Sequence, residues 1–156
     1  MEKIKWCLNI KKGLEIVEPS DNLAKIYLKK SEDALKAAAS LKGNRDWEIS
    51  SLYYSIYFAL YSVLMKIGIK SENHSCTIEF MKAFLKSYFD EKDVTLLEKS
   101  LKARVDAQYY VDRKVSDKDY KRMLENAPSF LVKCKEIVQN ITQEEIEITR
   151  DELKII

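Results

Sequence analysis

The sequence is poor both in residues that break helices and in residues that bind metals. Among its 156 residues there are three glycines, two prolines and one histidine. So few glycines and prolines predict few turns, and therefore long helices joined by short connections. Three isolated glycines also exclude a glycine-rich phosphate-binding loop. A single histidine, scattered cysteines and no ExxH spacing exclude the common zinc and di-iron sites, so we expect no metal and no cofactor.

The three cysteines, Cys7, Cys76 and Cys134, are odd in number, far apart and without any CxxC pair. This pattern predicts reduced thiols and a cytoplasmic protein rather than a disulfide framework. The N-terminus alternates lysines with apolar residues and offers no cleavage site, so no signal peptide is expected. The charge is nearly balanced, with 27 basic and 25 acidic residues, and does not by itself predict nucleic-acid binding.

One segment, residues 46–69, dominates the prediction of the fold. It carries no charge between Glu48 and Lys66 and no glycine before Gly68. An apolar stripe, a row of tyrosines and a row of small residues each recur at helical spacing, which predicts a helix that is buried on nearly every side. The small residues would permit close approach by another helix. The three rows are Ile49, Leu52, Ile56, Leu60, Val63 and Ile67; Tyr53, Tyr57 and Tyr61; and Ser51, Ser55, Ala59 and Ser62.

The tyrosine row of this helix, Tyr53, Tyr57 and Tyr61, has two interpretations. These side chains either belong to the core of one chain or form the interface of a homodimer, which would supply apolar cover and partners for the hydroxyls. The tyrosines and interleaved serines favour a buried helix of a soluble protein over a membrane span.

The remainder of the chain predicts four further helices and two terminal pieces. The helices cover about 20–41, 75–88, 90–112 and 116–138. Ser20 or Asp21 is the expected cap of the first, Asp90 opens the third, and Ser116 or Asp117 caps the fourth. Pro128 lies inside the last of them and should kink or split it. Residues 1–18 are expected to form a short helix or an extended arm, because no second strand is predicted to pair with their alternating pattern. Residues 141–156 are expected to be an acidic, loosely packed tail.

These elements predict an all-α fold. Short connections between long helices favour an up-and-down bundle of four to five antiparallel helices, formed by a single domain over residues 1–140 that includes the N-terminal arm.

Two groups of polar residues are candidates for chemistry. His74 is expected at a helix N-terminus, where the dipole would keep it neutral and able to accept a proton, unless it merely packs there. In the segment RVDAQYYVDR, helical spacing pairs Arg104 with Gln108, Asp106 with Tyr110, and Tyr109 with Arg113. Guanidinium and phenol groups suit binding to phosphates and bases. The same residues also build buried ion-pair networks, in which Arg104 would pair with Asp106 or another carboxylate.

At these residues the sequence resembles the HEPN domain family. The resemblance covers roughly residues 12–138 and is carried by GLEIVEPSDNLAKIYLKKSEDALKAA, by SSLYYSIYFALYSVLMKIGI followed by HSCTIEFMKAFL, and by RVDAQYYVDR. It implies a bundle of four or five helices that commonly forms homodimers. It also implies binding of nucleotides or RNA, often beside a minimal nucleotidyltransferase in archaeal and bacterial toxin–antitoxin pairs.

Many active members of this family are metal-independent endoribonucleases, and this sequence departs from their motif. The motif is an arginine followed a few residues later by a histidine. Arg104 matches the arginine, but Tyr109 and Tyr110 stand where the histidine would be. Tyrosine has an unperturbed pKa near 10, so it can donate a proton but is a poor base at neutral pH. Asp106 is the only base on this helix, and His74 could contribute only if the fold brings it to Arg104.

We therefore expect a homodimeric HEPN protein that binds nucleotide or RNA without cleaving it, as the partner of a minimal nucleotidyltransferase. One alternative is a divergent metal-independent endoribonuclease toxin with Arg104, His74 and Tyr110 as catalytic candidates. The other is a structural dimerisation module without a ligand site. No membrane partner is expected. The expected binding residues are Arg104, Asp106, Gln108, Tyr109, Tyr110 and Arg113, with Asp106 orienting Arg104.

Overall fold

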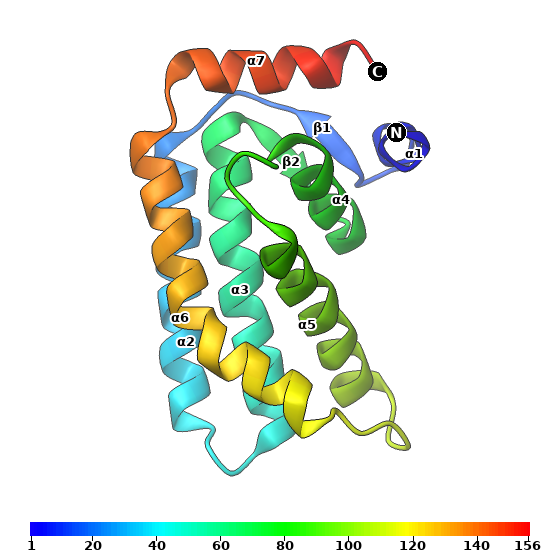
Figure 1. Ribbon diagram of the computed structural model, residues 1–156, viewed down its shortest axis with the longest axis vertical. Coiled ribbons are helices and arrows are strands. Elements are labelled where there is room, and N and C mark those ends of the chain that lie inside the picture. Colours follow the sequence, from blue (N-terminus) through cyan, green and yellow to red (C-terminus); the bar gives the residue numbers. More distant parts are fainter.

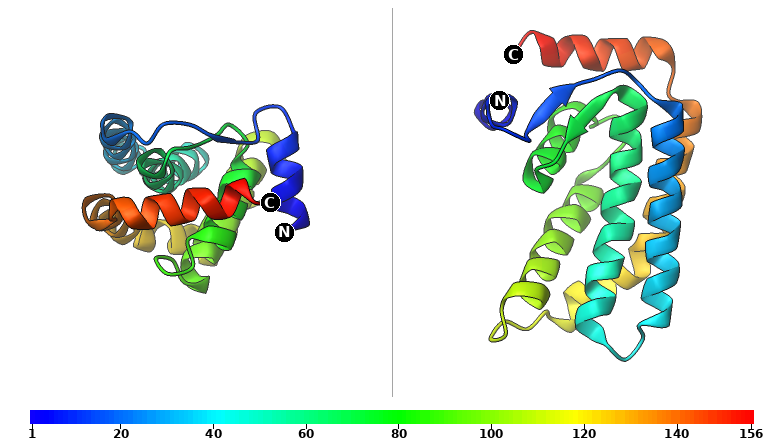
Figure 2. Two further views of the ribbon diagram at one scale, coloured as in Figure 1. Left: turned by 90° about the horizontal axis from the view of Figure 1, so that it is seen from above. Right: turned by 180° about the vertical axis from the view of Figure 1, so that it is seen from behind.

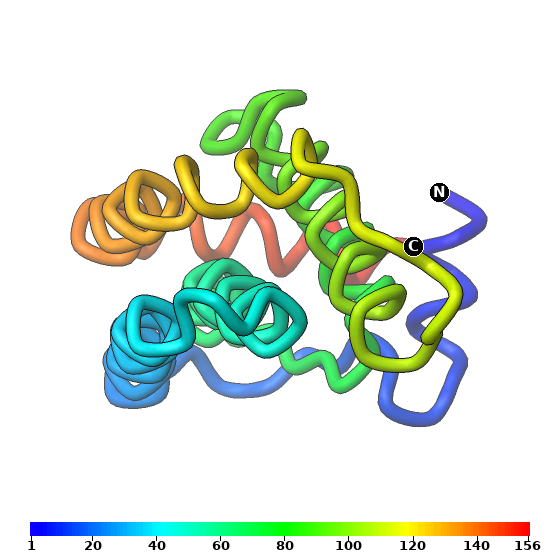
Figure 3. Tube along the Cα trace, turned by 90° about the horizontal axis from the view of Figure 1, so that it is seen from below, coloured from blue at the N-terminus to red at the C-terminus, as the bar shows by residue number.

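The computed structural model describes residues 1–156 as seven helices and a small two-stranded sheet (Figure 1). Helices α2, α3, α5 and α6 form the bundle, and Figure 3 shows them from below, with α2 and α3 side by side. The prediction of an all-α bundle is confirmed. The elements are α1 (Glu2–Asn9), β1 (Leu14–Ile16), α2 (Asp21–Ser40), α3 (Arg45–Ile67), β2 (Ile69–Ser71), α4 (His74–Phe84), α5 (Glu91–Tyr109), α6 (Asp117–Asn140) and α7 (Gln143–Lys154).

Helix α3 is the central element, as its apolar sequence predicted. Helices α2, α5 and α6 all pack against it, and its apolar stripe is fully buried. Its small residues allow α2 to come close, since Ser51 Oγ donates to Ala34 O at 2.7 Å and Ser31 Oγ donates to Ser55 O at 2.6 Å. None of the helices combines the length and apolar character that crossing a lipid bilayer requires.

The tyrosine row of α3 lies in the core of the single chain. The exposed fractions of Tyr53, Tyr57 and Tyr61 are 0%, 4% and 6%. Their hydroxyls are bonded inside the same chain, Tyr57 to Thr77 at 3.1 Å and Tyr61 to the Ser71 N–H at 3.1 Å. The dimer-interface interpretation of this row therefore finds no support in the packing, because the rings have almost no surface left to offer a second subunit.

The N-terminal segment pairs with a strand that the sequence did not reveal. Strand β1 is antiparallel to β2, with Leu14 opposite Ser71 and Ile16 opposite Ile69. The expectation that no partner strand exists was wrong. Each strand is only three residues long, and β2 directly follows the left-handed Gly68 that ends α3, so its residues resembled part of a loop.

The C-terminal segment is a helix, not a loosely packed tail. Thr142 and Glu145 form a capping box that starts α7, and Ile146 and Leu153 are buried. Arg150 fixes this helix to the end of the bundle through Nη1, which donates to the carbonyl oxygens of residues Val17, Ile67 and Gly68 at 2.6, 3.1 and 3.0 Å. Figure 2 (left) shows α7 lying across the end of the bundle.

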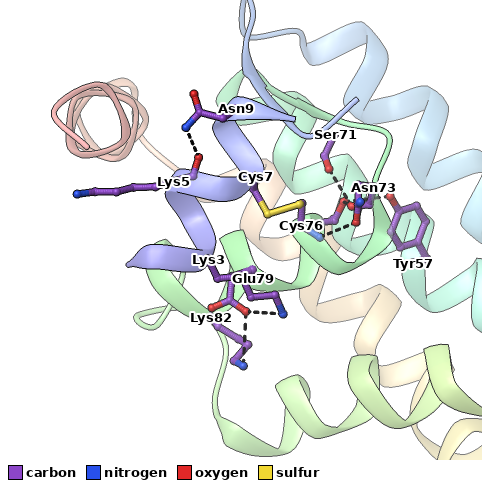
Figure 4. Close-up of a disulfide and its surroundings, with 11 residues drawn as sticks. Lys3, Lys5, Cys7, Asn9, Tyr57, Ser71, Asn73, Cys76, Glu79 and Lys82 are labelled. Carbon is purple, nitrogen blue, oxygen red and sulfur yellow. Dashed lines mark hydrogen bonds and ion pairs between the residues drawn. A yellow bond between two sulfur atoms is a disulfide. The ribbon is translucent and has the colours of Figure 1, made fainter. Parts of the chain in front are cut away.

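A disulfide joins Cys7 of α1 to Cys76 of α4 (Figure 4). Cys134 is free and buried. The prediction of three reduced thiols was therefore wrong. The two cysteines are 69 residues apart in the sequence and meet only because α1 packs on α4. The cysteine-based argument for a reducing compartment no longer holds.

Pro128 lies within α6 and does not divide it. The helix runs from Asp117 to Asn140, and its axis changes direction between its first and second halves in Figure 1. A proline ring displaces the carbonyl four residues earlier, which produces a bend when neighbouring contacts hold both halves. Of the two predicted outcomes, the kink is observed.

Candidate functional site

Arg104 is the centre of the candidate site. It lies on α5, and its Nε donates to Gln108 Oε1 at 3.1 Å, the pairing that helical spacing predicted. Its guanidinium carbon lies 5.5 Å from the ring centroid of Tyr53, 5.2 Å from that of Tyr54 and 5.9 Å from that of Tyr109. None of the ion pairs of the chain includes Arg104. The result is a partly exposed cation on aromatic faces, with guanidinium N–H groups available to a ligand.

His74 lies next to this arginine, as the first residue of α4. Asn73 caps the helix by accepting from the Cys76 N–H, and this places the imidazole over the inner tyrosines of α3. The ring stacks on Tyr57 with centroids 4.1 Å apart, and Nδ1 lies 2.6 Å from the Tyr53 hydroxyl. Arg104 and His74 thus both lie beside Tyr53 within one chain.

The environment keeps His74 uncharged. Burial lowers the pKa of His74 to about 4, and the positive charge of Arg104 adds to this effect. Burial also raises the pKa of Tyr53 far above its ordinary value, so its hydroxyl keeps its proton. That proton needs an acceptor, and Nδ1 is the one within reach. We therefore assign the hydrogen of the neutral imidazole to Nε2, which makes His74 a hydrogen-bond donor.

Asp106 belongs to a second, separate cluster. Asp106 is 5% exposed, and its carboxylate accepts from Lys102 Nζ at 2.7 Å and from Arg113 Nη1 at 3.3 Å. The Lys102 bond lowers the pKa of this carboxyl, with a further contribution from Arg113. The Arg113 guanidinium carbon lies 3.7 Å from the ring centroid of Tyr110.

This second cluster corrects two sequence-based predictions. Asp106 does not orient Arg104, and Tyr109 does not pair with Arg113. Helix α5 ends at Tyr109, so the helical spacing no longer applies beyond it, and the turn that follows brings Arg113 back to Asp106. The six predicted binding residues therefore separate into Arg104, Gln108 and Tyr109 on one side and Asp106, Tyr110 and Arg113 on the other.

A cavity of about 380 Å³ touches both clusters. Gln108 and Tyr109 line it from the first cluster, and Tyr110 and Arg113 from the second. Arg45, at the start of α3, adds a further cation that no sequence motif indicated, because it is distant in the chain. No three His, Cys, Asp or Glu side chains lie close enough to bind a metal ion together.

Sequence reasoning placed Tyr53 in the core or an interface and gave no role to Tyr54. Both rings lie against Arg104, and Tyr53 also holds His74. The sequence feature that could have indicated this role is the adjacent pair Tyr53 and Tyr54 in an otherwise apolar helix. It was insufficient because the arginine that faces these rings lies on another helix.

The family model, described as HEPN domain, matches residues 24–137, and the chain belongs to this family. A curated protein of Methanocaldococcus jannaschii, named "Putative toxin MJ0142", is 28% identical over 131 residues, which cover 79% of this chain and 88% of that protein.

Proposed function

We propose that this chain is a nucleotide- or RNA-binding HEPN protein of a toxin–antitoxin-like system that does not cleave RNA by itself. The observation that carries the proposal is the unpaired Arg104 guanidinium, held on the faces of Tyr53 and Tyr54 beside a neutral His74. A guanidinium binds phosphate oxygens in a bidentate manner, and the neighbouring rings suit stacking with bases.

The state of His74 argues against cleavage. Metal-free cleavage requires a base for the 2′-hydroxyl, with a pKa near the working pH. The lone pair of Nδ1 accepts from Tyr53, and a pKa of about 4 makes the imidazole a weak base. Tyr109 and Tyr110 stand where the motif's histidine would be. We infer that His74 donates through Nε2 to an oxygen of the bound ligand.

The assembly is part of the proposal. We propose a homodimer and a minimal nucleotidyltransferase as the partner, as the family resemblance implies, and the toxin name of the M. jannaschii relative supports a toxin–antitoxin setting. Because Tyr53, Tyr57 and Tyr61 are buried within the chain, the dimer would use other surfaces.

Binding and cleavage are tested with the purified protein and labelled single-stranded and structured RNA, without divalent metal. We expect binding without cleavage, and we expect Arg104→Ala to abolish binding with little change in melting temperature, because Arg104 forms no ion pair. Metal-independent cleavage that disappears in Arg104→Ala would refute the non-catalytic proposal. Lost stability with unchanged binding in this variant would instead favour a structural module. Co-purification with a neighbouring nucleotidyltransferase, followed by cleavage assays of the complex, tests the partner.

A divergent endoribonuclease is the second candidate, and one observation favours it. Arg104 and His74 both lie beside Tyr53 in the same chain, which would allow both residues to reach one ligand. This candidate requires growth arrest on expression and loss of that arrest in His74→Ala. Full toxicity of the His74→Ala protein would remove the histidine from the mechanism.

A further inference from the structure

The open face of α3 continues the Arg104 site as a line of aromatic rings. Figure 2 (right) shows α3 between α2 and α5, with no helix lying over its middle turns on this side. Tyr54 and Phe58 of α3 are half-buried and stack with centroids 5.4 Å apart. Tyr27 of α2 extends the line, 5.7 Å from Phe58. We call Tyr54, Phe58 and Tyr27 the aromatic strip.

A cation stands at each end of the aromatic strip. Arg104 lies 5.2 Å from the centroid of Tyr54, and Lys30 Nζ lies 5.5 Å from that of Phe58 and 5.9 Å from that of Tyr27. Lys30 is exposed and, like Arg104, is absent from the ion pairs of the chain. Two cations without acidic partners, separated by ring faces, complement a ligand that alternates negative charge with flat apolar groups.

We propose that the aromatic strip and Lys30 bind a single-stranded polynucleotide that runs from Arg104 across α3 to α2. This inference rests on the proposed function and specifies its ligand as a strand of several nucleotides rather than a mononucleotide. Arg104 holds one phosphate, Lys30 holds another further along the strand, and the bases between them stack on Tyr54 and Phe58. Such platforms bind single strands with little dependence on sequence, because every base has a flat face.

A second copy of this chain fits the same face less well. A two-fold contact through the strip would bring two sets of Lys30 and Arg104 into one interface, and the strip residues include no carboxylate to compensate them. Burying like charges without partners is costly. Charge complementarity therefore favours the polynucleotide as the occupant.

The test compares affinities for a dinucleotide and for a labelled RNA of about eight nucleotides, a length within the usual range of single-strand sites. We expect wild type to prefer the longer RNA, and Phe58→Leu, which keeps an apolar side chain, to reduce that preference by about fivefold or more. Lys30→Ala should lower the slope of log affinity against log salt by about 0.7, the contribution of one phosphate contact. Lys36→Ala, on another side of α2 and also outside every ion pair, is the matched control and should match wild type.

An RNA with abasic sites in the middle should bind wild type about as weakly as the normal RNA binds Phe58→Leu. A DNA of the same sequence shows whether the 2′-hydroxyl contributes to affinity. Melting temperatures confirm that each variant folds. If Arg104→Ala loses RNA binding but Lys30→Ala and Phe58→Leu retain the full length preference, the strip is refuted and the proposed function stands. If wild type binds no RNA, both are refuted. If these two variants change only the oligomeric state in sedimentation, the strip is an interface between copies and the inference is wrong.

Discussion

The titration of His74 tests the geometry of the site directly. His74 is the only histidine in the sequence, so its imidazole carbon protons give an isolated set of NMR signals. Burial lowers the pKa of His74 to about 4, and the charge of Arg104 contributes in the same direction. We expect a titration midpoint near 4, whereas an exposed histidine titrates near about 6.5.

Variants separate the causes of this shift. Arg104→Ala removes the charge and leaves the tyrosine packing, so the pKa of His74 should rise but stay well below 6.5, because burial is the larger cause. Arg104→Lys keeps the charge and should produce a smaller rise. Tyr53→Phe removes the hydroxyl that donates to the neutral imidazole, which should also raise the pKa.

The same shift makes stability depend on pH. The pKa of His74 is lower in the folded than in the unfolded chain, so between about 6.5 and 4 the unfolded chain binds more protons. The free energy of unfolding should therefore fall as the pH is lowered through this window, by about 1–3 kcal/mol once solvent screening is allowed for. Denaturant unfolding of wild type and His74→Gln isolates this contribution. A wild-type midpoint near 6.5, or no response to Arg104→Ala in a folded protein, would refute the arrangement of the site.

Three further predictions concern the packing around the site. Reduction of the Cys7–Cys76 disulfide should lower the free energy of unfolding by about 4 kcal/mol, because the unfolded chain regains the entropy of the opened loop. Calorimetry with and without reductant measures this loss, and an unchanged melting temperature would contradict it. Gly68→Ala should lower the free energy of unfolding by more than about 1 kcal/mol, because φ is 86° and a Cβ would lie 2.5 Å from Val17 O. Gly43→Ala is the control and should cost only about 1 kcal/mol, because φ is 94° but no atom lies within 4 Å of the added Cβ. Equal losses in the two variants would refute the steric argument. Arg150→Met should cost about 2–4 kcal/mol in denaturant unfolding, because several carbonyls lose their donor, and a neutral result would show that water replaces it.

The sequence was sufficient for the parts of the fold that depend on long periodic patterns. The apolar stripe of α3 extends over six positions, and such a pattern has one stable solution, a helix covered on several sides. The small residues beside it were correctly interpreted as the contact surface for another helix, which proved to be α2. The terminal segments were predicted less well because they are short. Strand β1 and helix α7 are defined mainly by contacts with distant residues, such as those of Arg150.

The site was predictable only up to the point where one helix ends. Within α5, four-residue spacing correctly paired Arg104 with Gln108. Beyond Tyr109 the same rule failed, because Arg113 lies in the following turn and reaches Asp106 instead. The approach of His74 to Arg104 depends on α5 packing beside α3 and on the contacts of the first residues of α4 with Tyr53 and Tyr57, and no local pattern contains that information.

The two aromatic rows of α3 have different roles, and this difference bears on the chemistry of the site. The inner row is buried and acts on His74, since Tyr57 stacks on the ring and Tyr53 occupies Nδ1. The outer ring, Tyr54, carries Arg104 and remains accessible. We propose that a site built in this way keeps its cation free for a phosphate while its imidazole is held as a donor. Recognition of a phosphate and activation of a hydroxyl are separate tasks, and the contacts around Tyr53 favour the first at the expense of the second.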